Sequence, residues 1–232
     1  MFGLFYFDWT ILIVLPALIF SVWAQINVSS TYKKYSTILT RKRITGADAA
    51  RRVLNENGLY DVRIEHVRGH LTDHYDPRAN VIRLSDSVYD SSSAAAVGVA
   101  CHEAGHAVQH AKGYSPIKLR MAIIPMTRFG SMLAIPLFMI GLIFATDALM
   151  LAGILLYAVV AFFQLVTLPV EFNASSRAME AIKSSGMLDK DEYSASRKVL
   201  TAAAMTYVAA LASSLLTLLR LLVLAGGRGN RR

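Results

Sequence analysis

The stretch that decides the expected fold is His102-Glu103-Ala104-Gly105-His106, which matches the pattern H-E-x-x-H. Two histidines four residues apart share one face of an α-helix, where both imidazoles can reach the same metal ion. The helix predicted to carry them covers residues 92–112, is rich in alanine and ends at Gly113. The pattern therefore predicts a Zn²⁺ site in which His102 and His106 are ligands and Glu103 is the general base.

The composition around this helix is that of a membrane protein. Of the 232 residues, 54% are hydrophobic and 17% are charged, and the apolar residues gather in runs close to the ~20 residues needed to cross a bilayer. Spans are predicted at about 7–24, 129–145 and 148–170, with a weaker fourth run at 200–224 that contains Arg220. The expected fold class is mainly α and integral to the membrane, with three to four transmembrane helices.

The distribution of basic residues predicts the topology. Most of the 24 Lys and Arg fall in residues 27–120 and 171–198, and the turn at Thr146-Asp147 has none. The positive-inside rule places both loops in the cytoplasm and the N-terminus outside. We therefore assign the net charge of +8 to topology and expect no nucleic-acid partner. We expect the fourth run to cross the membrane because of its length and hydrophobicity. The basic residues after position 226 would then lie outside, against the positive-inside rule.

The first apolar run is predicted to be an anchor. A cleavable signal begins with basic residues and ends at a small-residue cleavage site, and neither feature flanks this run. The single cysteine, Cys101, excludes a disulfide within the chain.

The first loop is predicted to hold a small α+β fold. Residues 46–58 form a helix capped by Thr45, and residues 62–67 and 80–84 alternate as strands do. The turn at 76–80 between them predicts a short antiparallel sheet before the motif helix. We expect strand 81–84 to form an edge that pairs with an extended peptide.

A catalytic zinc usually takes three protein ligands, so a third must be found. Glu171 is favoured, because it follows the third span on the motif's side and a second helix that brings a glutamate is the gluzincin arrangement. A helix-terminal charge without a ligand role is the alternative for Glu171. His110 lies ~12 Å of helical rise beyond His102. It therefore cannot share the ion, and we expect it to support the site from outside or to be solvated.

Other ligand sets are less favoured. The metzincin extension fails, since Gln109 and Lys112 stand where its glycine and histidine should be. Ordinary polar roles are expected for the histidines of the strand region, His66, His70 and His74.

Three stretches together resemble the YugP-like bacterial membrane zinc metallopeptidases: residues 73–85, 101–109 and 168–175. The resemblance covers nearly the whole chain and implies a neutral zinc peptidase with a cytoplasmic gluzincin-like domain, distantly similar to the HtpX and CAAX-protease group. In that wider group an aspartate four residues after the ligand glutamate orients a zinc histidine. Here that position is Ser175, which implies a weaker contact to the histidine or support from elsewhere.

The predicted function is a membrane-bound zinc-dependent endopeptidase of a bacterial plasma membrane, multi-pass, with its catalytic domain facing the cytoplasm. Its expected partners are the lipid bilayer and a peptide or membrane-protein substrate. Tyr207 is a candidate donor to the tetrahedral oxyanion, and packing within a helix is the alternative for it. Two other functions stay open, a non-catalytic zinc-binding scaffold and an intramembrane site-two-type protease.

The predicted organisation has six parts in chain order. They are an anchor (1–26), the first peptidase part with the motif helix (27–120), a transmembrane hairpin (121–170), the second peptidase part with the third ligand (171–198), a C-terminal apolar helix (199–225) and a basic tail (226–232).

Overall fold

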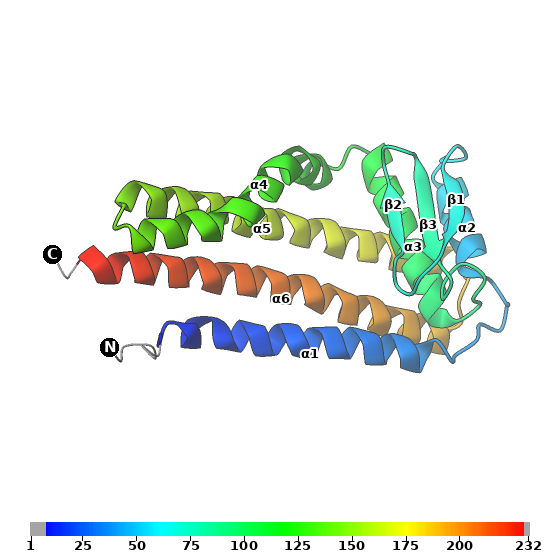
Figure 1. Ribbon diagram of the computed structural model, residues 1–232. Coiled ribbons are helices and arrows are strands. Elements are labelled where there is room, and N and C mark those ends of the chain that lie inside the picture. The colour runs from blue at the N-terminus through cyan, green and yellow to red at the C-terminus, as the bar shows by residue number, and fades with distance from the viewer. Residues whose placement is uncertain (1–7, 230–232) are drawn as a thin grey trace. The chain divides into compact units, whose positions relative to one another are not determined.

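The computed structural model describes residues 8–229 (Figure 1). The elements in chain order are α1 (Ile11–Tyr35), α2 (Gly46–Glu56), β1 (Arg63–Val67), β2 (His74–Asp76), β3 (Val81–Ser85), α3 (Ala94–Ala111), α4 (Ser115–Ile143), α5 (Asp147–Ser184) and α6 (Lys190–Gly229). The chain divides into two compact units. The first unit comprises residues 1–23, 119–168 and 207–232, and the second comprises residues 24–118 and 169–206.

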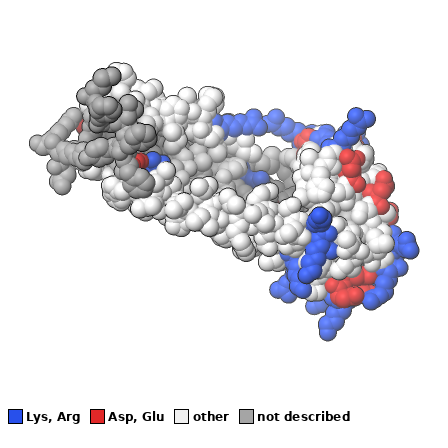
Figure 2. All heavy atoms as spheres, turned by 60° about the horizontal axis from the view of Figure 1, so that its bottom comes forward, with Lys and Arg blue, Asp and Glu red and all other residues white. Residues whose placement is uncertain are grey.

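The first unit consists of segments of four helices. In the described residues, α1, α4, α5 and α6 are each long and apolar enough to cross a membrane, which agrees with a mainly helical membrane protein. Large apolar side chains are exposed on this unit, including Leu18, Ile19, Phe129, Phe144 and Leu155. Such a surface is unfavourable in water and suits contact with lipid. In Figure 2 the acidic and basic side chains gather over the second unit, and the described surface of the first unit seen there carries few.

Within the first unit, α4 and α5 form the expected hairpin. Its turn falls between Ile143 and Asp147, and Ala145 adopts a positive φ of 59° there. Gly153 lets the two helices approach closely, because a Cβ at this position would lie 2.7 Å from the carbonyl oxygen of Ala134. Small residues at such contacts are typical of helix packing in membranes.

Arg220 is paired within the first unit. Its guanidinium donates to Asp8 Oδ2 at 2.6 Å and to Thr10 Oγ1 at 3.1 Å. The charge that weakened the prediction of a fourth span is therefore compensated by a carboxylate at the start of α1.

In the second unit the predicted helix at residues 46–58 is confirmed as α2. Thr45 and Asp48 form a capping box, in which each side chain bonds the backbone N–H of the other. Asn57 ends the helix, and Gly58 follows with a φ of 73°. The motif helix is confirmed as α3, and Ser93 caps its N-terminus. The helix ends before Gly113, which has a φ of 63°.

The sheet differs from the predicted antiparallel pairing of residues 62–67 with residues 80–84. Its strand order is β1-β3-β2, with β2 antiparallel to β3 but β1 parallel to β3. The chain leaves β1, forms β2 and returns through a turn, so β3 runs in the direction of β1 and lies between the other two strands. The expectation that strand 81–84 is an edge is therefore wrong, because both of its sides are already hydrogen-bonded.

Two helices are longer than the sequence predicted. Glu171 was expected to open a helical segment of its own, but α5 continues through it without a break to Ser184. Likewise α6 is continuous from Lys190 across residues 198–199, where the peptidase part was expected to give way to a separate helix. The apolar core of the second unit lies among α2, α3, the inner face of the sheet and the parts of α5 and α6 that belong to this unit; it includes Leu54, Ile82, Val97, Ile182 and Val199.

Candidate metal centre

Three side chains converge in the second unit. Histidines 102 and 106 lie on adjacent turns of α3, with ring centroids 4.7 Å apart and planes at 85° to each other. Glu171, on α5, places Oε2 3.3 Å from His102 Nε2 and 3.4 Å from His106 Nε2. The side chains of the two histidines are 13% and 12% exposed, and that of Glu171 is 3% exposed. The three can hold one metal ion, since their ligand atoms lie within 4.8 Å of one another.

This donor set fits zinc. Zn²⁺ binds imidazole nitrogens and carboxylate oxygens at ~2.0–2.2 Å with tetrahedral geometry, which separates neighbouring ligand atoms by roughly 3.3 Å. The two N–O separations are 3.3 and 3.4 Å. Three protein ligands leave one tetrahedral position for water or substrate, as catalytic zinc sites do.

The other nitrogen of each histidine is engaged by an uncharged side chain. His102 Nδ1 lies 3.1 Å from Ser175 Oγ, and His106 Nδ1 lies 3.0 Å from Gln109 Oε1. These contacts direct Nε2 of both rings toward Glu171. Ser175, which was expected to contact one of the zinc histidines, lies at His102, and Gln109 takes the corresponding place at His106.

Gly105 explains how α5 comes so close to α3. A Cβ at this position would lie 2.7 Å from the carbonyl oxygen of Ala174 and 3.3 Å from its Cα. The fourth residue of the H-E-x-x-H pattern is therefore the point at which the backbone of α5 meets the motif helix. Ala174 lies three residues beyond Glu171 and next to Ser175, so this contact sets the height of both side chains.

Glu103 is buried beside the ligands, with only 8% of its surface exposed. Burial alone would lower the pKa of the neighbouring His106, but the contact with the Glu171 carboxylate at 3.4 Å and the negative charges of Glu103 and Glu171 outweigh it. The pKa of His106 in the metal-free protein is therefore raised. The two carboxylates therefore favour positive charge at this site, and Zn²⁺ carries twice the charge of a proton.

The remaining candidates are not among the three residues whose ligand atoms converge. The ring of His110 contacts Tyr75 of β2, with centroids 6.1 Å apart. Tyr207 lies on α6 at the start of a segment of the first unit, and its role stays a prediction. The histidines of the strand region make polar or ring contacts: His66 bonds Asp86, His74 bonds the Thr72 carbonyl and His70 packs against Tyr32.

The contacts of Gln109 were not predicted from the sequence, where this residue was noted for breaking the metzincin pattern. The available signal was its spacing, because a residue three positions after His106 lies on the same side of the helix. Which atom it contacts depends on α5, which the spacing does not reveal.

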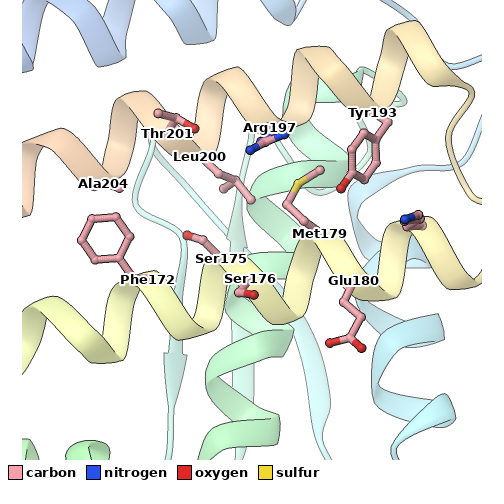
Figure 3. A pocket seen from close by; sticks show the side chains of 11 residues that line it. Phe172, Ser175, Ser176, Met179, Glu180, Tyr193, Arg197, Leu200, Thr201 and Ala204 are labelled. Atoms are coloured by element: carbon pink, nitrogen blue, oxygen red, sulfur yellow. The ribbon is translucent and has the colours of Figure 1, made fainter.

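A pocket of about 580 Å³ opens in the second unit between α5 and α6. Ser175 lines it together with Phe172, Ser176 and Met179 of α5 and with Arg197 and Thr201 of α6 (Figure 3). One side chain of this wall, Ser175, is thus also the one that contacts His102. A molecule in the pocket could contact Ser175, whose hydroxyl lies next to His102.

Proteins similar to this chain are described as peptidases or proteases. A family model described as "Putative neutral zinc metallopeptidase" matches residues 10–226. The chain is 49% identical over 214 residues to the "Putative membrane protease YugP" of Bacillus subtilis (strain 168), a match that covers 92% of this chain and 95% of that protein. No solved structure matches the chain.

Proposed function

We infer that this chain, which belongs to the family described as "Putative neutral zinc metallopeptidase", is a membrane-bound zinc-dependent endopeptidase. The observation that carries the inference is the convergence of His102, His106 and Glu171 within 4.8 Å, with spacings that suit tetrahedral zinc. Glu103 directly follows His102, is buried, and acts on His106 through its negative charge, so it supplies a general base next to the metal site.

The chemistry divides between the ion and the protein. When bound, Zn²⁺ would polarise the scissile carbonyl and lower the pKa of a water molecule. The two histidines and Glu171 hold the ion. The carboxylate of Glu103 accepts the proton of the attacking water and delivers it to the nitrogen of the leaving amine. Burial of Glu103 supports this role, because a carboxylate screened from bulk water keeps the proton within the site.

The substrate would be an extended segment of polypeptide. Since β3 is the central strand, the unpaired edges of the described sheet belong to β1 and β2. Tyr75 of β2 contacts His110 of the motif helix, so β2 is the edge next to α3. We place the peptide along β2, where backbone hydrogen bonds would hold it extended in the way that sheet edges bind peptides.

The connection to the membrane suggests what is cleaved. α1, α5 and α6 each run without interruption from the first unit into the second, and α5 carries Glu171 and Ser175. A site tethered to candidate spans in this way would act on membrane proteins or on flexible segments near a membrane. From the distribution of Lys and Arg we place it on the cytoplasmic side of the plasma membrane.

The test measures zinc content and proteolysis on the full-length protein, purified in detergent, for the wild type, Glu103→Gln and Glu171→Ala. We expect Glu103→Gln to keep stoichiometric zinc and to lose cleavage by at least ~100-fold, which is the scale of a general base. We expect Glu171→Ala to lose zinc. Removal of zinc from the wild type by a chelator should abolish cleavage, and added Zn²⁺ should restore it.

Two results would contradict the proposal. Wild-type zinc affinity in Glu171→Ala would exclude Glu171 as a ligand. A zinc-loaded wild type that cleaves neither soluble nor membrane-embedded polypeptides would favour a non-catalytic scaffold. The intramembrane alternative receives no support, because α3 is not among the candidate spans found in the described residues.

A further inference from the structure

We propose that Gln109 is a positioning residue that sets the tautomer of His106 and at the same time holds α5 at the height from which Glu171 reaches the site. Its side chain is fully buried and makes three hydrogen bonds. Oε1 lies 3.0 Å from His106 Nδ1, and Nε2 donates to the Val170 carbonyl at 2.7 Å and to Asn173 Oδ1 at 3.0 Å.

The contacts to α5 determine which way the amide faces. The carbonyl oxygen of Val170 can only accept a hydrogen bond, so the group facing it must be the NH₂ of Gln109. The oxygen of the amide therefore faces His106, and an amide oxygen can only accept. It follows that Nδ1 of His106 carries a proton, which leaves Nε2, 3.4 Å from Glu171 Oε2, as the nitrogen that can bind a metal ion.

The same side chain connects the two elements that supply ligands. Gln109 belongs to α3, one turn after His106, whereas Val170 and Asn173 flank Glu171 on α5. A shift of α5 along α3 would break the bond to the Val170 carbonyl before it moved Glu171 by a full turn. Asn173 Oδ1 also accepts from Arg177 Nε at 2.8 Å, so the amide of Asn173 is itself held in place.

A glutamine suits this position better than the carboxylate that orients many zinc histidines. A glutamate would accept from His106 equally well, but it has no N–H for the Val170 carbonyl. A buried carboxylate facing a carbonyl oxygen would be unfavourable, because neither group could donate to the other. The uncharged amide thus performs two tasks that a carboxylate could not combine.

This inference rests on the proposed zinc site but does not require peptidase activity. The test therefore reads the histidine ring and the metal, using full-length protein in detergent with ¹⁵N-labelled histidine. The variants are Gln109→Met, which keeps the length of the side chain and removes all three hydrogen bonds, and Gln109→Glu, which keeps only the acceptor toward His106. The matched control is Ser196→Ala, which removes another buried tie to α3, the bond from Ser196 to the Ala94 carbonyl.

In the wild type without metal, we expect the ¹⁵N spectrum of His106 to show Nδ1 protonated, whether or not Nε2 also carries a proton next to Glu171. In Gln109→Met we expect a mixture of tautomers at His106, an unchanged spectrum at His102 and a zinc affinity lowered by ~10–100-fold. Gln109→Glu should retain the Nδ1–H tautomer yet bind zinc more weakly than the wild type. Ser196→Ala should lose thermal stability while its zinc affinity and both histidine spectra stay as in the wild type.

An unchanged His106 tautomer and zinc affinity in Gln109→Met would overturn the proposal, and so would an equal loss of zinc affinity in Ser196→Ala. If Gln109→Met does not fold, Gln109→Glu decides: loss of the Nδ1–H tautomer there would overturn the assignment. A wild type that binds zinc with the expected tautomer and cleaves no peptide would contradict the proposed function and leave this inference standing.

Discussion

At the scale of single residues, the site combines one charged ligand with uncharged support. Ser175 and Gln109 stand at the Nδ1 atoms of His102 and His106, where zinc proteins often place a carboxylate. Neutral support leaves the imidazoles less basic, so more of the positive charge of a bound ion stays available to polarise a substrate carbonyl. In the proposed mechanism the carboxylate of Glu171 binds the ion and that of Glu103 transfers the proton.

Ser175→Ala should lower zinc affinity by ~10-fold, because His102 then lacks a partner that fixes its ring. Ser175→Asp should bind zinc at least as tightly as the wild type, since a carboxylate orients the ring more strongly and the adjoining pocket gives it room (Figure 3). Competition with a chelator measures both affinities. Ser176→Ala, one residue along α5 in the same pocket wall, is the control. An equal loss in the control would refute a specific role for Ser175.

Zinc affinity should depend on pH through His106. Its pKa in the metal-free protein is raised above the ordinary value of 6.5 by Glu171 and Glu103, against the effect of burial. A proton on His106 competes with Zn²⁺, so affinity should fall tenfold per pH unit below this raised pKa and level off above it. The protonated ring also stabilises the metal-free protein below the unfolded pKa, and this contribution is lost as pH rises through the folded pKa.

Chelator competition and thermal unfolding between pH 5.5 and 8.5 check this pH dependence. We expect zinc to raise the unfolding temperature most at the alkaline end of the range. An affinity that changes only below the ordinary histidine pKa of ~6.5 would contradict the raised pKa.

At the scale of elements, the site depends on how closely α3 and α5 approach. Neither helix contains all three ligands, and the contact at Gly105 brings the two together. The sheet contributes differently: β3 is paired on both sides, so the substrate segment of the proposed function would pair with an outer strand. The sequence predicted β1 and β3 but not β2, which lies between them in the chain. Because the chain reverses direction at each end of β2, β1 and β3 run parallel.

Gly105→Ala should destabilise the second unit and weaken zinc binding together. Its Cβ would meet the Ala174 backbone at 2.7 Å, and backbone cannot move aside as a flexible side chain can. We expect the free energy of unfolding to fall by about 2 kcal/mol, the usual scale for overpacking. Gly226→Ala on α6, where a new Cβ would meet nothing within 4 Å, should leave both properties unchanged. Chemical denaturation and zinc titration check the two effects; normal zinc affinity in Gly105→Ala would show that the close approach is not needed.

At the scale of the whole molecule, the two units share their helices. α1, α4, α5 and α6 supply the candidate spans, and a part of each also belongs to the second unit, which contains the candidate metal centre. In the first unit, the pair between Asp8 and Arg220 compensates the charge that interrupts the fourth apolar run. An even number of crossings would put both ends of the chain on one side and the second unit on the other.

Cysteine labelling in intact cells tests this topology. Cys101 is buried, so the wild type should react poorly with a membrane-impermeant maleimide. Thr146→Cys, in the turn between α4 and α5, should be labelled in intact cells. Tyr60→Cys, at a position where the wild-type residue is 74% exposed, should be labelled only after the cells are permeabilised. The reverse labelling pattern would show that the orientation is opposite to the proposed one.

The sequence by itself determined the features that depend on neighbours along the chain. These are the motif helix with its two histidines, the α2 helix with its Thr45 cap, the apolar runs and the hairpin turn, because helix period, capping and span length are local properties. Glu171 was predicted as the third ligand because it follows the third span on the motif's side. The parallel pairing of β1 with β3, the role of Gln109 and the contact at Gly105 were decided by the tertiary structure alone. Each depends on how closely and at what height two distant segments pack, and no local pattern encodes that.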